Sequence, residues 1–450
     1  MPASQDPVSV AARAVEMALK VGADAADACT LYASNLGLSV RDGQIDTLNR
    51  AVSRGLSLRV TLDRRTAMAH TTDLSAYSLA RLATTALEMA RVLPESQEPV
   101  YYGAAQAIEA LPHPDPDLQS ETIEAKARRL SEIEKAMLAV PGMTRSYSVS
   151  WSQRDGEMGL VNSRGLSLYA PVCRVEVGVE GIAERDGESF TGGYSAAVPT
   201  RRALPDPAEM GRRAGARAVE LLGARAVPST KAPVIFAPQT GWALLACLSE
   251  ALRGDNVVQR RSYLADRKGQ VIAAPAVTIR DNPLLTRGVA RGTFDAEGSP
   301  TRDLALVQNG RLQSYLCDLA AGAQLGVPGG GNAVRGSYDS RIEIGTSNLY
   351  LEAGGDTPEA IVQGTPRGLL VTSLSGWWVG RSSVEDTFSS AAMGLWIENG
   401  QPAYPVRGVT IGGTLLAMLS GVDRIGNDLE FLHENSTPTF RVAEMAISGT

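Results

Sequence analysis

Hydrophobic and polar positions follow different patterns in the two halves of the chain. In the first half, apolar residues recur with the period of an amphipathic helix in four segments, between which they alternate with polar residues as in half-buried strands. The four helical segments are residues 6–22, 73–93, 120–140 and 206–223. In the second half, one long helical segment at residues 242–255 is followed by short apolar runs between glycines. The pattern predicts an α+β protein whose second half is mostly β.

A sequence fragment occurs twice in the first half. Residues 41–58 and residues 154–168 both begin with Arg-Asp-Gly and end with Ser-Arg-Gly-Leu-Ser-Leu. Asp-Gly is a strong signal for a hairpin turn, because both positions adopt positive φ easily. The repeat predicts an N-terminal α+β domain at residues 1–226, made by duplication of a helix, β-meander, helix unit at about 1–110 and 111–226. A chance similarity between two turn motifs is the alternative.

The second half, residues 227–450, is predicted to form a separate C-terminal domain. Its short apolar runs alternate like strands, and Asn-Gly turn signals occur at Asn309-Gly310 and Asn399-Gly400. Closely spaced strands with such turns are typical of antiparallel sheets. We therefore expect a mostly antiparallel barrel or sandwich.

Composition excludes several classes of function. The 43 basic and 49 acidic residues give a formal net charge of -6 without a basic block, which argues against a nucleic-acid partner. No uncharged apolar run reaches the ~20 residues that a membrane span needs. The first residues do not resemble a secretion signal, and the four cysteines lie far apart without Cys-x-x-Cys pairing. We expect a soluble cytoplasmic protein that binds neither membranes nor nucleic acid.

Candidate catalytic groups are sparse. Only three histidines are present, all far apart in sequence, so a His-based metal site would have to be assembled across the whole chain. The sequence has no Gly-x-Ser-x-Gly motif for a serine nucleophile. The helical segment WALLACLSEALRGD has no histidine and only one carboxylate before Gly254. This segment is either ordinary core or an active-site helix without its chemistry.

Two other features have both a functional and a structural interpretation. The glycine loop at residues 326–336 could offer backbone amides to an anion, but it lacks the lysine of a phosphate loop and the strand-to-helix context of a dinucleotide fingerprint. A flexible loop or a close backbone approach is the other interpretation. Trp377 and Trp378 either flank a binding groove or pack in a sheet core.

An ordered series of motifs covers nearly the whole chain and resembles the TldD/TldE family, also called the TldD/PmbA family. The series runs through RDGQI, SRGLSLRV, RGTFDAEGSPTRDLALVQNGRLQSYLCD, GGGNAVR, TSNLYLEAG, GLLVTSLSG, GLWIENGQPAYPVRGVTIGGTLLAML and IGNDLEF.

The resemblance implies where a metal site would lie. In the catalytic TldD branch, a zinc metallopeptidase domain carries His-Glu-x-x-x-His on a helix just before Gly-Asp, and a cysteine near the C-terminus completes the site. Anchoring this motif on Gly254 and Asp255 places Leu245 at the first histidine, Ala246 at the glutamate and Glu250 at the second histidine. Leucine cannot bind zinc, alanine cannot act as a base, and the last quarter of the chain has no cysteine. We therefore expect no catalytic residue, metal or cofactor in this chain.

This pattern resembles the TldE (PmbA) branch, whose members lack a zinc site and pair with a zinc-bearing TldD-like subunit. The resemblance implies a non-catalytic subunit of a heterodimeric or larger complex that cleaves unfolded or small peptides, including modified natural products, bound as extended strands. The alternative is a homodimeric, metal-free peptide-binding or biosynthetic accessory protein without a protease partner. A third possibility is an enzyme in which other groups replace the metal.

Residues 375–389 depart from the family pattern. Relatives often have Thr-Gly-Asp-(Phe or Tyr)-Ser where this chain has VEDTFS. If this loop lines the substrate chamber, Trp377, Trp378 and Asp386 are candidate chamber residues for a specialised substrate. The alternative is that the loop has merely drifted.

Overall fold

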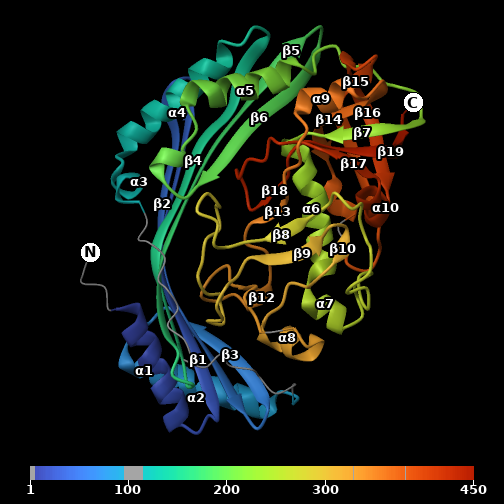
Figure 1. The fold of residues 1–450 in the computed structure, drawn as a ribbon. Coiled ribbons are helices and arrows are strands. Elements are labelled where there is room, and N and C mark those ends of the chain that lie inside the picture. The colour runs from blue at the N-terminus through green and yellow to red at the C-terminus, as the bar shows by residue number, and fades with distance from the viewer. Residues whose placement is uncertain (1–5, 96–114, 328, 381, 450) are drawn as a thin grey trace.

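The computed structural model describes residues 6–95, 115–327, 329–380 and 382–449. Figure 1 shows a long curved sheet with helices on one side of the molecule and a β-rich C-terminal body on the other. The mixture of helices with mostly antiparallel strands confirms the predicted α+β class. None of the helices in these residues combines the length and apolar character that crossing a bilayer requires.

The curved sheet has six antiparallel strands. They are β1 (Ala25–Arg41), β2 (Gln44–Leu62), β3 (Arg65–Thr71), β4 (Met143–Asn162), β5 (Ser167–Arg185) and β6 (Glu188–Val198). Their order in the sheet is β3-β2-β1-β4-β5-β6, so two three-strand meanders meet where β1 pairs with β4. The central strands are long and cross the full height of the molecule (Figure 1).

Helices cover one face of this sheet. They are α1 (Pro7–Lys20), α2 (Ala76–Val92), α3 (Pro116–Ser120), α4 (Ile123–Leu138) and α5 (Pro207–Val219), with the 3-10 turn η1 (Arg201–Ala203). Side-chain caps start all five α-helices, at Asp6, Ser75, Asp115, Thr122 and Asp206. Helices α1 and α2 form one apolar core with β1, β2 and β3, and α4 and α5 form a second core around Trp151. The other face of the sheet points toward the C-terminal body.

The repeated sequence fragment is out of register with the structural repeat. The hairpin turn predicted at Asp42-Gly43 is confirmed, with φ of 51° and 71°. The turn signal of the second copy is misleading, because Asp155-Gly156 lies inside β4. Gly156 permits a close strand approach there, since a Cβ would lie 2.0 Å from the carbonyl oxygen of Tyr32. The turn between β4 and β5 instead contains Gly165, with φ of 88°.

Both meanders are nevertheless bracketed by helices, as α1-β1-β2-β3-α2 and α4-β4-β5-β6-α5. The helix and β-meander architecture expected for the first half is therefore present. The proposed boundary between the two units, near residue 110, lies outside the described residues. Their origin by duplication stays a prediction.

The C-terminal body contains a closed barrel. Its strands are β7 (Thr230–Phe236), β14 (Arg367–Ser375), β15 (Phe388–Glu398), β16 (Gln401–Gly413) and β19 (Phe440–Ser448), with β17 (Val422–Ile425) attached to β19. The pairing order is β16-β15-β14-β7-β19, and β19 pairs back with β16 to close the barrel. All these pairs except β14–β7 are antiparallel, which confirms the predicted barrel.

A second sheet lies beside the barrel. Its strands are β8 (Ile279–Asp281), β9 (Leu304–Gln308), β10 (Arg311–Leu312), β13 (Leu349–Leu351) and β18 (Asn435–Ser436), in the order β10-β9-β8-β13-β18. A separate pair is formed by β11 (Ala333–Val334) and β12 (Glu343–Ile344). The turns predicted at Asn309-Gly310 and Asn399-Gly400 are confirmed, because all four residues have φ between 49° and 77°.

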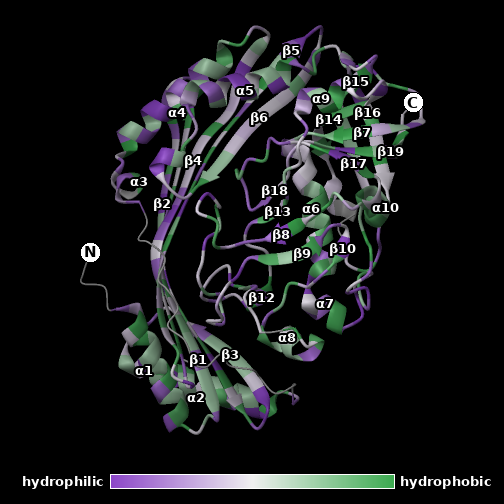
Figure 2. Cartoon of the chain, viewed as in Figure 1, coloured by the Kyte–Doolittle hydropathy of each residue, from purple (hydrophilic) through white to green (hydrophobic). Residues whose placement is uncertain are grey.

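Helix α6 (Pro238–Leu252) lies between the barrel and the second sheet, and 11 of its 15 residues are buried. A helix that is apolar on every side is typical of the centre of a core. The other helical segments are short: α7 (Gly254–Val258), α8 (Leu319–Leu325), α9 (Pro358–Gln363), α10 (Leu415–Ser420) and the 3-10 turn η2 (Trp377–Gly380). Figure 2 shows hydrophobic colouring on the barrel strands and recurrent hydrophilic colouring on α4 and α5.

The curved sheet and the C-terminal body meet at an upper and a lower contact, and between them Arg154 of β4 donates to the Gly336 carbonyl at 3.3 Å. The upper contact lies near the connection from α5 to β7 and includes the ion pairs Arg213–Glu430 and Arg174–Glu434. The lower contact, at the far end of the sheet, joins β1 and β2 to the loop at residues 292–300. The domain boundary proposed at residues 226/227 falls between α5 and β7 and stays a proposal.

Candidate functional site

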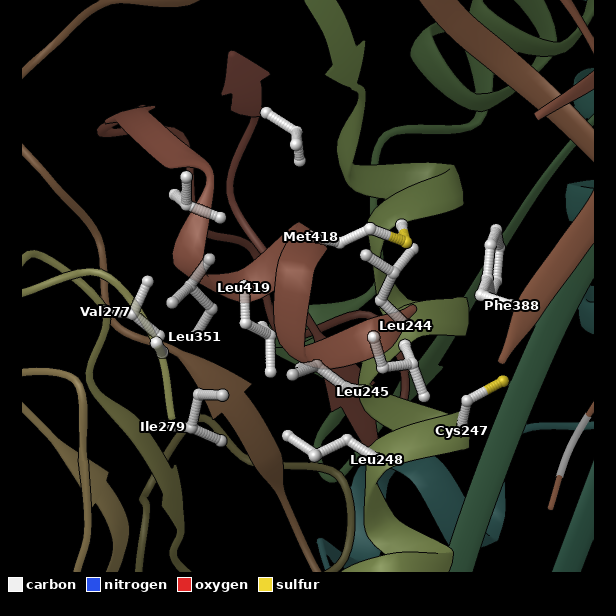
Figure 3. Packing of buried hydrophobic residues seen from close by; sticks show 14 of the residues in the cluster. Leu244, Leu245, Cys247, Leu248, Val277, Ile279, Leu351, Phe388, Met418 and Leu419 are labelled. Atoms are coloured by element: carbon white, nitrogen blue, oxygen red, sulfur yellow. The ribbon is translucent and has the colours of Figure 1, made fainter. Parts of the chain in front are cut away.

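Two of the residues that the resemblance aligns with the zinc motif, Leu245 and Ala246, are part of the apolar core. Leu245 and Ala246 lie on α6 and are 3% and 4% exposed. Figure 3 shows Leu245 beside Leu419 of α10, within the apolar cluster. Together with Val277 and Ile279, these two leucines line a small apolar cavity. The side chains of Leu245 and Ala246 therefore offer no ligand atom to a metal.

The third position, Glu250, belongs to an ion cluster at the end of α6. Arg253 binds both carboxylate oxygens of Asp255, with Nε–Oδ1 and Nη2–Oδ2 distances of 3.2 and 2.9 Å. The Nη1 of Arg253 also lies 4.0 Å from Oε2 of Glu250. Asn256 fixes the same turn by donating its side-chain amide to the Glu250 carbonyl at 2.9 Å. A guanidinium is thus the cation that neutralises both carboxylates.

The Gly-Asp pair that ends α6 has a packing role. The N–H of Gly254 donates to the Leu316 carbonyl at 2.7 Å. A Cβ at position 254 would lie 2.9 Å from that oxygen and 3.0 Å from Sγ of Cys317. Burial raises the pKa of Cys317 to about 12, so its sulfur is a protonated thiol at neutral pH. Glycine is required because the chain passes directly beside residues 316–317.

Three tryptophans form a ladder from the surface to α6. Trp378 is 60% exposed, and its ring lies edge-on to Trp377 with 6.1 Å between centroids. Trp377 in turn lies edge-on to Trp242 of α6 at 4.8 Å, a geometry that aromatic rings favour. Trp242 stands one turn before Leu245 and was not predicted as a site residue. Its place one helical turn before Leu245 is the sequence feature that could have indicated it.

Asp386 binds the backbone at the start of α10 and not the two tryptophans of its loop. Its Oδ1 accepts the N–H of Leu416 at 3.1 Å, at the start of α10. Burial raises the pKa of Asp386, and hydrogen bonds from the α10 backbone partly oppose this. Within the described residues no contact joins Asp386 to Trp377 or Trp378. The structure therefore brings the two tryptophans together and places Asp386 as an anchor for α10.

The glycine loop does cradle an anion, but the anion is a side chain of the protein itself. Asp295 accepts four backbone N–H groups: from Gly331 and Ala333 at 2.7 and 3.1 Å, and from Glu297 and Ser299 at 2.9 Å each. This carboxylate joins the loop at residues 329–333 to the turn at residues 295–299. The phosphate-site interpretation loses its basis, because these two loop amides already have an acceptor.

The residues at the α6 motif do not fit zinc. They offer an apolar side chain, a methyl group and a carboxylate that already faces Arg253. Elsewhere in the part of the chain that is described, no three His, Cys, Asp or Glu side chains form a group that could hold a metal ion. His70 lies edge-on to Tyr338, and His433 lies 3.3 Å from the Ser195 hydroxyl. Both histidines join the curved sheet to the C-terminal body, and His113 lies outside the described residues.

The fold and the ordered series of sequence motifs define a metallopeptidase-like protein. Models of the PmbA/TldA metallopeptidase family match nearly the whole chain: domain 1 at residues 26–90, the central domain at 116–222 and the C-terminal domain at 229–449. The chain therefore belongs to the PmbA/TldD family.

Individual relatives agree with this assignment. Metalloprotease PmbA of Escherichia coli O157:H7 is 28% identical, over 97% of this chain and 95% of its own length. A TldD homolog of Haemophilus influenzae is 24% identical, over 87% of this chain and 83% of its own length. The crystal structure of TldE from Thermococcus kodakarensis has a TM-score of 0.88 at 19% identity and covers 98% of this chain and 100% of that one. The family resemblance is confirmed, and the fold is shared.

Proposed function

We propose that this chain is a TldE/PmbA-like, non-catalytic subunit of a zinc metallopeptidase complex that cleaves unfolded or small peptides. The observation that carries the proposal is the burial of Leu245 in the apolar core at the position of the first metal ligand. The ion cluster of Glu250, Arg253 and Asp255 supports it, because Arg253 already supplies the positive charge. A TldD-like partner would supply zinc, with the complex heterodimeric or larger. The four free cysteines fit a cytoplasmic location.

In this proposal the chain forms a wall of the substrate chamber. The tryptophan ladder supports this role, because a 60% exposed indole on a partly buried one offers an apolar side chain of the peptide a flat surface. Asp386 contributes indirectly by anchoring α10. The divergent loop at residues 375–389 would then distinguish substrates without touching the scissile bond.

The deciding experiment is co-expression with TldD-like proteins, followed by copurification, metal analysis and a peptidase assay. We expect zinc and activity in the complex and neither in this chain alone. Stoichiometric zinc in the isolated chain, with chelator-sensitive peptidase activity, would contradict the proposal.

The chamber role has its own test in the reconstituted complex. Trp378→Ala should raise KM for peptides with large apolar residues by about fivefold and leave KM for glycine-rich peptides unchanged. Val384→Ala is the matched control, because this side chain is 63% exposed in the same loop. Equal effects of the two substitutions on KM would contradict a role of Trp378 in the substrate chamber.

The alternative is a homodimeric, metal-free peptide-binding or accessory protein. The closed core around Leu245 also favours it, because that core is complete without any group from another chain. Light scattering of the isolated protein and binding of a fluorescent unfolded peptide separate the two proposals. A stable homodimer that binds peptide and ignores every TldD-like chain would favour the alternative.

A further inference from the structure

The lower contact between the curved sheet and the C-terminal body is built on one shared guanidinium. Arg59 of β2 donates Nε to Asp27 of β1 at 2.5 Å and Nη1 to Glu297 at 3.4 Å. Glu297 belongs to the loop at residues 292–300, and its second oxygen accepts the N–H of Leu319 at the start of α8 at 2.9 Å. The Glu297 carboxylate therefore joins the sheet, the loop and α8, with a side chain only 6% exposed.

Acidic groups outnumber basic ones around Glu297. Asp295 precedes it in the same loop, and Asp318 caps α8 on the other side. The second cation of the contact, Arg335, donates to a serine hydroxyl of β2 and not to a carboxylate. Two buried carboxylates thus share Arg59, with two more acidic groups nearby. Such an arrangement favours uptake of a proton.

The apolar part of this contact is small. Phe294 packs on Cys29, Leu160 and Leu166 of the sheet, in a cluster separate from the cores of both parts. Gly298 rests directly on Leu166, where a Cβ would lie 2.2 Å from a methyl carbon. Opening this contact would expose this cluster and the ring of Tyr338, which packs on Gly55 and His70, and would leave the larger cores intact.

The lower contact is also the end of the sheet that has no chain connection to the body. The chain passes from the sheet to the body at the upper contact, where Phe190, Leu221 and Ala224 form a further apolar cluster with Met393. Figure 1 shows the lower contact at the opposite end of the curved sheet, near α8 and β3. A separation of the two parts would therefore begin at the lower contact.

We propose that the lower contact is a proton-linked latch, which holds the C-terminal body on the sheet while Glu297 is protonated and loosens when Glu297 ionises. Its opening widens access to the sheet face that points toward the body. The proposal concerns regulation and holds whether or not a catalytic partner exists.

The direction of the pH effect follows from the burial of Glu297. Burial raises the pKa of Glu297 from its ordinary 4.5 to about 7, and Arg59 opposes part of this rise. In the open form the carboxylate meets water, and its pKa returns toward the ordinary value. The closed form therefore binds the proton more tightly, so the contact is strongest in acid and weakens as pH rises through about 7. Between one pH unit below and one above this value, the ratio of closed to open forms should fall about tenfold.

Cys29 is a native probe of this opening. It lies in the apolar cluster of the lower contact and is 3% exposed, so a thiol reagent reaches it only when the contact opens. The experiment labels the full-length protein at a series of pH values and reads each cysteine by peptide mass spectrometry, with rates divided by those of a free cysteine peptide. Cys247 in the C-terminal core is the internal reference for global unfolding.

We expect the normalised labelling rate of Cys29 to rise about tenfold across neutrality while that of Cys247 stays level. Glu297→Gln, which cannot ionise, should flatten the rise, and Glu297→Asp should keep its direction. Glu434→Gln, which breaks an ion pair of the upper contact, is the matched control and should leave the rise unchanged. A Cys29 rate that does not depend on pH, or the same rise in Glu297→Gln, would overturn the latch.

Discussion

Truncation of Leu245 tests whether the altered motif is core or an open site. Leu245 is 3% exposed, and Leu245→Ala removes most of a buried side chain from the centre of the largest core. Core leucine truncations cost about 3 to 5 kcal/mol of unfolding free energy, more where the surroundings cannot collapse. Because Leu245 already borders a small cavity, the new space would enlarge it, and we expect a loss of about 4 kcal/mol.

Guanidinium unfolding followed by tryptophan fluorescence and circular dichroism measures this loss. The matched control is Leu284→Ala, at a leucine that is 46% exposed, where we expect a loss of only about 0.5 kcal/mol. If Leu245 instead faced an open, water-filled metal position, its truncation would cost no more than the control does. A loss below about 1 kcal/mol would therefore refute the reasoning and reopen the question of a functional site on α6.

Three further substitutions test other parts of the structure. Arg253→Met leaves Glu250 and Asp255 without their cation and should cost about 1 kcal/mol, seen as a lower Tm that Arg253→Lys partly restores. Asp386→Ala removes an anchor of α10 and should cost about 1 kcal/mol, with faster amide exchange in residues 415–420. Burial raises the pKa of Asp281 from 3.8 to about 6, so its contribution to stability is present in acid and is lost as pH rises from about 4 to 6. Asp281→Asn should flatten that part of the stability profile; an unchanged slope would assign it to other groups.

Features that depend on neighbouring residues could be predicted from the sequence. The hairpin turns at Asp42-Gly43, Asn309-Gly310 and Asn399-Gly400 formed where expected, because positive φ is a property of the turn residues themselves. Helix α6 was predicted from its continuous apolar pattern. The Asp-Gly turn signal failed at Asp155-Gly156, because β4 continues through that pair. The backbone pairing of the strand outweighs the local preference for a turn.

Features that depend on distant residues could not be predicted. Barrel closure requires β19 to pair with β16, and nothing in either strand identifies the other. The anion bound by the glycine loop is Asp295, which lies 36 residues before Gly331, so the sequence of the loop alone left its role open. The tryptophan ladder likewise joins Trp242 to Trp377 across the fold. In each case the partner is supplied by tertiary structure and not by local sequence.

Under the proposed function, side chains of this chain stabilise the part of the fold where a metallopeptidase would hold its metal. A metal site stabilises a fold when the ligands would otherwise be buried polar groups without partners. Here Leu245 and Ala246 have no polar atoms to satisfy, and Glu250 and Asp255 are neutralised by Arg253. Every requirement that a metal would meet is met by this chain itself. In the proposed function the fold serves as a wall or a partner surface, and a second chain supplies the zinc.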